Sequence, residues 1–242
     1  MPVMFANSLW DGFLLSSAVG QGIVLLQLAA GFVGVAVCIG KWRDIADSKS
    51  RYARFLDDFE ASGEVLEYYL NRRPTEEAGL EGIYRKTCER LLRVISPDVR
   101  TLLTGRGAEG GAAAALTARE IDLVRGTCEF SLEGEQMRLE RATGITATIV
   151  AVSPMLGLLG TVWGVLDAFA EMGSAGTANL ATIAPSISSA LVTTVVGLLV
   201  ALPGIIIYNI QIYTIGKLSA QAGGFADELI GRIACEFQGR GA

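Results

Sequence analysis

Long apolar stretches separated by charged segments form the pattern of this chain. The longest stretch, residues 143–209, contains neither lysine nor arginine. About 20 apolar residues in a helix are enough to cross the roughly 30 Å hydrocarbon core of a bilayer. The stretch therefore predicts two membrane-spanning helices, over residues 144–168 and 182–210, which are joined by a turn at residues 169–181.

A third apolar run lies near the N-terminus, over residues 14–40, and residues 1–13 before it contain no basic side chain. A secretory signal peptide begins with a basic region and is shorter than this run. We therefore interpret the run as a retained membrane-spanning helix. Gln21 and Gln27 interrupt it, and we expect each of them to bond a neighbouring helix rather than a ligand.

The basic residues predict the orientation of the three spans. All lysines and arginines lie between Lys41 and Arg141 or in the tail from Lys217 onward. Basic residues close to span ends favour the cytoplasmic side of the membrane. We therefore expect residues 41–143 and 211–242 in the cytoplasm, with the N-terminus and the short turn in the periplasm.

The polar segment at residues 41–143 is helical by pattern. An apolar stripe leads up to Gly63, and a short helix can follow over residues 64–71. Pro74 and the acids after it predict the start of another helix, whose apolar face runs over residues 80–95.

Two further helices are expected beside the spans. Thr117 and Glu120 form a capping-box signature, and the helix that they open is predicted to run without a break into the second span. Residues 105–115, just before it, are of low complexity. After the third span the apolar spacing persists, which predicts that its helix continues inward and packs an amphipathic end over residues 226–237.

Composition narrows the classes of function. The 242 residues are 51% hydrophobic, include no histidine and carry a net charge of −5, which gives no reason to expect a nucleic-acid partner. The four cysteines have no CxxC spacing, so we expect small buried side chains rather than a metal site. No catalytic constellation or phosphate-binding loop is present, and we expect neither enzymatic activity nor a cofactor.

Small residues gather inside the last two spans. Small side chains mark the faces at which helices in lipid approach closely. We assign a packing role to these, together with two prolines that are expected to kink the spans: Gly157, Gly160, Gly164, Gly197, Ala201, Pro154 and Pro203. A further proline, Pro185, is expected in the first turn of its helix, where no hydrogen-bond donor is lost.

Three threonines lie among these small residues, at Thr161, Thr193 and Thr194. Their hydroxyls can bond to carbonyls of their own helices, or they can line a hydrated path through the membrane. Composition alone leaves both interpretations open.

The sequences SPMLGLLGTVWGVLDAF and IAPSISSALVTTVVGLLVALPGIIIYN resemble the two signature helices of the TolQ/ExbB/MotA proton-channel family, and they are most similar to its TolQ and ExbB branches. The likeness extends without gaps over residues 143–209. It implies an all-α protein of the bacterial inner membrane that assembles into a homo-oligomeric ring, a pentamer in this family.

The resemblance also implies a function. The ring would surround a single-span partner, ExbD or TolR, whose helix carries an aspartate in the pore. The pore threonines of the family match Thr161 and Thr194, beside which Thr193 lies. Ion flow would then drive work on a TonB-like or TolA-like envelope protein.

One position departs from the family. Ser189 stands where many TolQ and ExbB relatives have a glutamate, just before the Ala-Leu pair of the last span. It is either a lineage variant or a change in the gate, the coupling ion or the partner, and it leaves sodium coupling open.

Two functional classes follow for the chain. The first, which we favour, is a stator subunit of an ion-driven motor. The second is a membrane scaffold that oligomerises through its small-residue faces and conducts nothing. A self-contained transporter is disfavoured by three spans and no inverted repeat.

Overall fold

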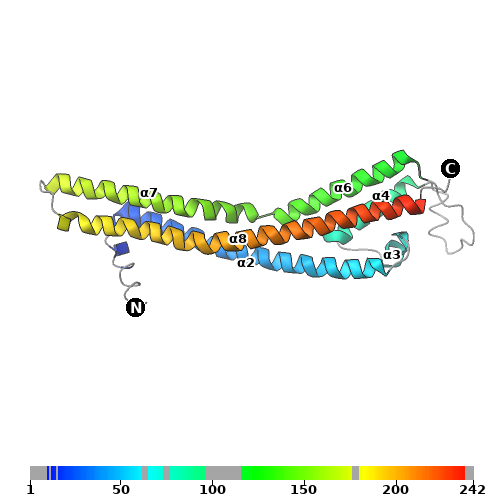
Figure 1. Cartoon of the computed structure of the whole chain (residues 1–242), viewed down its shortest axis with the longest axis horizontal. Helices are drawn as coiled ribbons and strands as arrows, with labels where there is room; N and C mark the ends of the chain where they lie inside the picture. The colour runs from blue at the N-terminus through cyan, green and yellow to red at the C-terminus, as the bar shows by residue number, and fades with distance from the viewer. Residues whose placement is uncertain are drawn as a thin grey trace, which may run out of the picture. The chain divides into compact units, whose positions relative to one another are not determined.

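Long helices make up the described part of the chain. The computed structural model describes residues 10, 12–14, 16–61, 65–72, 77–95, 116–175 and 180–237. Figure 1 shows the helices α2 (Ala18–Glu60), α3 (Val65–Arg72), α4 (Gly79–Val94), α6 (Ala118–Glu140), α7 (Thr143–Ala175) and α8 (Leu180–Phe237). No strand occurs within these ranges, and the predicted all-α class is confirmed.

The chain folds as two compact units. The first, which we call the membrane unit, comprises residues 1–42 and 142–212. The second, the extramembrane unit, comprises residues 43–141 and 213–242. Helix α7 belongs wholly to the membrane unit, whereas α3, α4 and α6 belong to the extramembrane unit.

Three helices in the described part of the chain are long and apolar enough to cross a membrane. In the membrane unit their outward faces carry large apolar side chains. Phe32 is 78% exposed, and Leu158 is 62% exposed. A soluble monomer rarely exposes contiguous apolar surface of this kind, whereas a bilayer accommodates it. The prediction of three membrane-spanning helices is confirmed.

Helix α2 extends far beyond the first predicted span. It runs without interruption from Ala18 to Glu60. The predicted apolar stripe, which includes Tyr52, Phe55 and Phe59, therefore lies on the same helix as the span, and all three side chains are buried.

The clearest departure from the predictions lies at residues 141 and 142. We predicted an uninterrupted helix from Thr117 through the second span, but α6 ends at Glu140 and α7 begins at Thr143. Ala142 has a φ of 69°, in the left-handed region that residues with a side chain rarely adopt. A residue in this conformation ends a right-handed helix, so the two helices are separate.

The connection between the second and third spans is shorter than predicted. Helix α7 continues to Ala175 and α8 begins at Leu180, so most of the turn predicted at residues 169–181 is helical. Pro185 consequently lies beyond the first turn of α8, contrary to our expectation, and the helix lacks one backbone hydrogen bond there.

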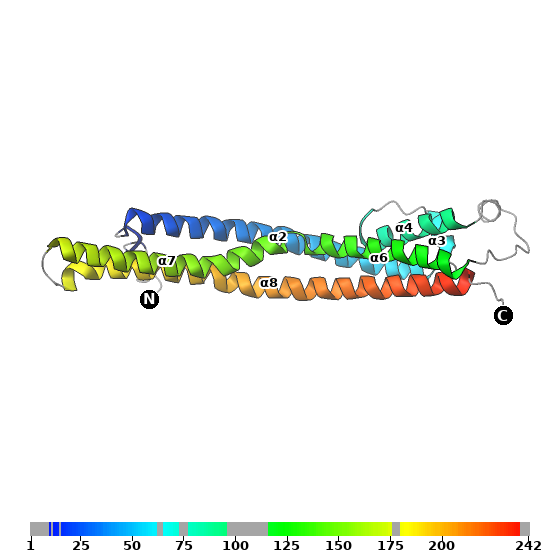
Figure 2. The ribbon, with the colours of Figure 1, turned by 90° about the horizontal axis from the view of Figure 1, so that it is seen from above.

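Aromatic side chains form the centre of the extramembrane unit. The ring centroids of Phe55 and Phe225 lie 5.3 Å apart with an interplanar angle of 84°, and those of Phe59 and Phe225 lie 5.2 Å apart at 80°. Edge-to-face pairs of this kind stabilise a core beyond the area that they bury. Figure 2 shows α6 and α8 beside the second half of α2 in this unit.

The apolar faces predicted for this unit are buried. On α4 and just after it these are Leu80, Ile83, Thr87, Leu91 and Ile95, and on α8 they are Leu229, Ile230, Ile233 and Phe237. Both predicted faces are confirmed, and so is the continuation of the third span into a helix that reaches Phe237.

The ends of the shorter helices follow local chemistry. The capping box is confirmed: the Thr117 hydroxyl accepts from the Glu120 backbone N–H, and the Glu120 carboxylate accepts from the Thr117 N–H. Helix α4 begins at Gly79, later than the start that we predicted at Pro74. Pro74 itself, like Gly63 and residues 105–115, lies outside the described residues.

Three of the four cysteines are buried, as predicted, whereas Cys235 is exposed. In the extramembrane unit, burial raises the pKa of Cys88 to about 12. Cys88 is therefore a protonated thiol that acts as a small apolar side chain, because the thiolate is the reactive form of cysteine.

Candidate ion-path site in the membrane unit

Helices α7 and α8 approach each other closely at glycine residues. A Cβ atom added at Gly164 would lie 2.5 Å from the Ala190 Cβ, and one added at Gly160 would overlap the Thr193 hydroxyl. Real Cβ atoms do not come this close to other atoms, so both positions require glycine for the helices to keep their separation. Ala190 is itself buried, which places this contact inside the helix pair.

We expect Gly164→Ala to destabilise the membrane unit by about 1–3 kcal/mol, the usual cost of inserting a methyl group into a close-packed contact. The added Cβ would meet the Ala190 methyl and the α8 backbone, neither of which can rotate away. Gly173→Ala on the same helix is the matched control, because a Cβ there would meet no atom within 4 Å. Thermal unfolding of the detergent-solubilised protein measures both, and equal midpoints for the two variants would contradict the close contact.

The threonine hydroxyls of α8 converge on one carbonyl of α7. Thr194 Oγ1 donates to the Gly157 carbonyl at 2.9 Å, and Thr193 Oγ1 lies 3.2 Å from the same oxygen and 2.7 Å from the carbonyl of Ala190 on its own helix. Thr193 is 1% exposed, whereas Thr194 is half-buried. The structure thus brings two of the predicted threonines together at Gly157.

Thr161, the third predicted threonine, makes a different contact. Its hydroxyl donates to the Leu158 carbonyl of its own helix at 2.7 Å. The structure does not bring Thr161 into the cluster at Gly157. Of the two interpretations that composition left open, Thr161 follows the first, because it bonds to its own helix. The Thr194 bond crosses to α7 and matches neither, so the hydrated path stays a prediction.

Ser189 lies on α8, about one helical turn before Thr193. Its side chain is 5% exposed, and its hydroxyl donates to the Ser186 carbonyl at 2.9 Å. The Ser186 hydroxyl in turn donates to the Glu171 carboxylate at 2.7 Å. A carboxylate from α7 therefore contacts α8 at Ser186, three residues before Ser189.

The two glutamines of α2 behave differently. Gln27 Nε2 donates to the Ser153 carbonyl of α7 at 3.2 Å, so the predicted bond to a neighbouring helix is confirmed. Gln21 Nε2 donates to the carbonyl of Phe13, which lies in the helical residues 12–14 before α2, so its partner is a nearby segment rather than another span.

An apolar cavity of about 460 Å³ lies among the three spans. Gly31 of α2 and Gly204 of α8 contribute to its wall, as does Pro203, one of the predicted packing residues. Ala201, another of them, is buried. The cavity lining is largely apolar and does not include the threonines that meet at Gly157, so the cavity does not extend the threonine cluster.

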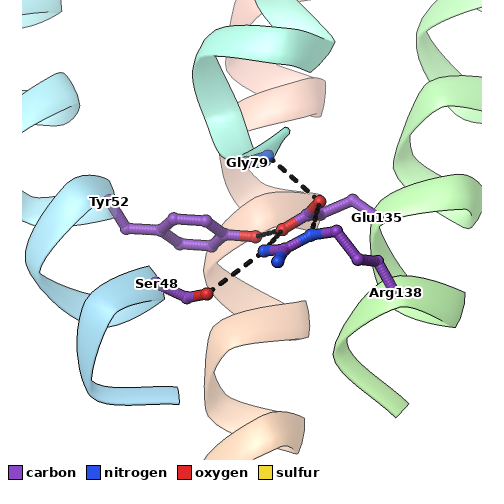
Figure 3. Close-up of polar contacts among 5 residues, drawn as sticks. All are labelled: Ser48, Tyr52, Gly79, Glu135 and Arg138. Atoms are coloured by element: carbon purple, nitrogen blue, oxygen red, sulfur yellow. Dashed lines mark hydrogen bonds and ion pairs between the residues drawn. The ribbon is translucent and has the colours of Figure 1, made fainter. Parts of the chain in front are cut away.

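A second polar cluster, in the extramembrane unit, was not predicted. Figure 3 shows the Glu135 carboxylate of α6 between α2 and the start of α4. It accepts from the Tyr52 hydroxyl at 2.8 Å, from the Gly79 N–H at 3.0 Å and from Arg138, whose two nitrogens lie 2.7 and 2.8 Å away. Arg138 also donates to the Ser48 hydroxyl at 3.1 Å. One buried carboxylate thereby ties three helices together.

Opposing effects act on the protonation of Glu135. Burial raises the pKa of this carboxyl, but the hydrogen bonds from Arg138, Tyr52 and Gly79 outweigh burial, and the net pKa lies below the ordinary value of a glutamate. Glu135 is therefore ionised at neutral pH. A carboxylate with all these donors is a structural ion pair rather than a proton carrier.

A signal for Glu135 exists in the sequence. The buried positions of α6 recur at helical spacing and are Ile121, Val124, Cys128, Ser131, Glu135 and Leu139. An acid in the register of a buried face requires a cation or several donors.

Comparisons with known proteins find similarity to one family of membrane proteins. Residues 104–222 match the model of the MotA/TolQ/ExbB proton channel family. The chain is 29% identical over 224 residues to the Tol-Pal system protein TolQ of Haemophilus influenzae, with 90% of each chain covered. It is 27% identical over 237 residues to TolQ of Pseudomonas aeruginosa, which covers 96% of this chain and 91% of that protein.

The chain is also similar to another group of proteins. It is 36% identical over 143 residues to the biopolymer transport protein ExbB of Salmonella typhimurium. This match covers 51% of the chain and 59% of ExbB, which is less than two thirds of that protein.

Proposed function

Because the chain belongs to the TolQ/ExbB branch of the TolQ/ExbB/MotA proton-channel family, we propose that it is the stator subunit of an energy-transducing complex driven by the proton-motive force. The protein is a multi-pass protein of the inner membrane. Its work would be to form an ion channel with a single-span partner and to pass mechanical work to an envelope protein.

The meeting of the Thr193 and Thr194 hydroxyls at the Gly157 carbonyl carries this proposal. Hydroxyls can donate and accept hydrogen bonds and relay them through water, but they cannot hold a proton at neutral pH. The spans contain no carboxylate or histidine apart from Asp167 and Glu171. Both lie on α7 after Gly157, closer to the C-terminal end of that helix. The titrating group must therefore come from another chain.

A partner helix with an intramembrane aspartate, as in ExbD and TolR, supplies this group. Proton uptake would neutralise its carboxylate beside the half-buried Thr194, and proton release would restore the charge. Each change alters how the partner helix fits against hydroxyls inside the bilayer, where an uncompensated charge is unfavourable. This cycle requires no covalent chemistry, metal or cofactor from the chain, so we propose no enzymatic activity.

Self-association into a ring is part of the proposal. Leu123, Phe130 and Met137 of α6 are spaced seven residues apart and are 46%, 76% and 71% exposed. Apolar side chains at this spacing lie on one helix face, and such a face outside the membrane favours a protein contact over water. We propose a pentamer of this chain around the partner, with a TonB-like or TolA-like protein receiving the work.

The charge distribution supports a proposed orientation. We place the extramembrane unit and the C-terminus in the cytoplasm, and the α7–α8 connection in the periplasm, because basic residues flank the spans only on the side of the extramembrane unit. Cysteine labelling with a membrane-impermeant reagent tests this, since a single cysteine introduced at Gly173 should react from the periplasm.

Ion flux in liposomes tests the function. The protein is reconstituted with and without its single-span partner, and flux is recorded under a proton gradient and, separately, under a sodium gradient. Proton flux that requires the partner supports the proposed channel, and sodium flux that requires it supports a sodium-coupled stator. An intact complex that carries no flux under either gradient would favour the non-conducting scaffold.

A further inference from the structure

Gln27 brings a buried amide from α2 to the place where α7 and α8 approach each other. Its side chain is 0% exposed, and its Nε2 donates to the Ser153 carbonyl. A Cβ added at Gly197 would lie 2.8 Å from this Nε2 and 2.7 Å from the Ser153 oxygen. Glycine at position 197 thus leaves the space that the amide and the carbonyl occupy, and three spans meet around one polar contact.

The same contact adjoins the threonine pair. A Cβ added at Gly157 would lie 3.4 Å from Gln27 Nε2 and 2.9 Å from Thr194 Cα. Ser153 lies one helical turn before Gly157, so the two carbonyls belong to successive turns of α7. A bond that holds the Ser153 carbonyl therefore also restrains the turn that presents the Gly157 oxygen to the threonines.

Packing alone does not explain an amide at position 27. Within the described residues, Gln27 Oε1 has no hydrogen-bond partner. A buried carbonyl oxygen without a donor is unfavourable, especially at membrane depth. Leucine would fill a similar volume without this penalty. If the amide has a role at this position, that role therefore depends on its N–H donor.

We propose that Gln27 is a positioning residue of the ion path. Its amide holds the Ser153 carbonyl and thereby fixes the acceptor on which the Thr193 and Thr194 hydroxyls meet. This inference rests on the proposed function, because a scaffold without ion flow has no path to position. It assigns to α2, the span that carries none of the threonines, a direct effect on conduction.

Gln211 of α8 is a matched control for Gln27. It is also 0% exposed, its Nε2 donates to the Cys38 carbonyl of α2 at 3.1 Å, and its Oε1 likewise has no partner within the described residues. At 1.5 Å per residue, Cys38 lies roughly 16 Å along α2 from Gln27. The two amides therefore have the same chemistry and burial, but only Gln27 adjoins the threonines.

The first experiment compares Gln27→Leu with Gln211→Leu in liposomes that also contain the single-span partner. We expect Gln27→Leu to lower ion flux about tenfold, the factor associated with one buried hydrogen bond left unmade. Gln211→Leu should keep wild-type flux, with both complexes intact by size-exclusion chromatography. Wild-type flux in Gln27→Leu, or equal losses in the two variants, would overturn the positioning role.

Gln27→Glu tests the donor directly and keeps the shape of the side chain. The protonated acid has one O–H that can donate to the Ser153 carbonyl, whereas the ionised form has none. Ser153, Gly157 and Gly197, which surround the amide, carry no titratable side chain. The ratio of Gln27→Glu flux to wild-type flux should therefore be highest at low pH and fall as the pH rises, and a ratio independent of pH would contradict the inference.

Failure of this inference is distinguishable from failure of the proposed function. If wild-type flux is lost in Thr194→Val but kept in Gln27→Leu, the inference is wrong and the channel stands. If the intact wild-type complex carries no flux, the proposed function fails and the positioning role with it.

Discussion

Replacing Thr194 with valine should reduce ion flux at least tenfold while the complex stays assembled. Valine keeps the shape of threonine but removes the hydroxyl that donates to the Gly157 carbonyl. Thr193 still lies within bonding distance of that carbonyl, so the helix pair keeps one of its two contacts there. The size of the loss follows from one unmade hydrogen bond at a site of low dielectric constant, and flux in liposomes with the partner measures it.

Thr148→Val is the control for this variant. Thr148 lies on α7, is part of the membrane unit, and donates its hydroxyl to the Gly144 carbonyl of its own helix, one turn away. We expect this substitution to leave flux at the wild-type level. If Thr194→Val also conducts like the wild type, the cross-helix threonine contact serves packing alone, and Thr194 is not part of the ion path.

Replacing Glu135 with alanine should destabilise the extramembrane unit by about 3–5 kcal/mol, the usual loss when one partner of a buried ion pair is removed. The substitution leaves Tyr52, the Gly79 N–H and Arg138 without their shared acceptor. Hydrogen exchange of the amides in α4 and α6 measures the loss as faster exchange. Glu133→Ala, at an exposed position on the same helix, should exchange like the wild type.

The same carboxylate makes stability depend on pH in a defined direction. Its pKa is lower in the folded protein than in the unfolded chain, so its contribution is complete above the unfolded value of about 4.3. As the pH falls from there through the lower folded pKa, that contribution is lost. Glu135→Gln, which cannot ionise, should show a weaker acid dependence, and an unchanged acid limb would contradict the assigned role.

Much of the fold was predictable because it depends on patterns along the chain. The length of an apolar run determines whether a helix can cross a bilayer, and the three spans follow from it. The capping box at Thr117 and Glu120 uses two neighbouring side chains, and the buried face of α4 depends on local spacing. None of these features requires a distant part of the chain.

The break between α6 and α7 was not predictable on the same grounds. Ala142 favours helices, and neither glycine nor proline stands at that position to mark a change of direction. Its left-handed conformation therefore does not follow from the local preference of alanine. A pattern of apolar residues cannot reveal such a break, because the residues on both sides of it have the pattern of a helix.

The candidate site was predictable in its residue types but not in its contacts. Glycines in the apolar spans indicated that two helices approach each other closely, and threonines there indicated polar groups within the membrane. Which carbonyl accepts each hydroxyl depends on the register between α7 and α8, and a sequence does not give this register. It therefore could not show that Thr161 bonds to its own helix whereas Thr194 bonds to α7. Gln27 was assigned to a neighbouring helix, but its place beside Gly157 was not foreseen.

The Glu135 cluster also imposes an order of events during synthesis. Its acceptor is made 83 residues after Tyr52 and 56 residues after Gly79. At about 5–20 residues per second, the Tyr52 hydroxyl is translated roughly 4–17 s before its partner exists. The first part of the extramembrane unit must remain hydrated during this interval, and its core closes only when α8, which follows α6 and α7 in the chain, contributes Leu229 and Ile233.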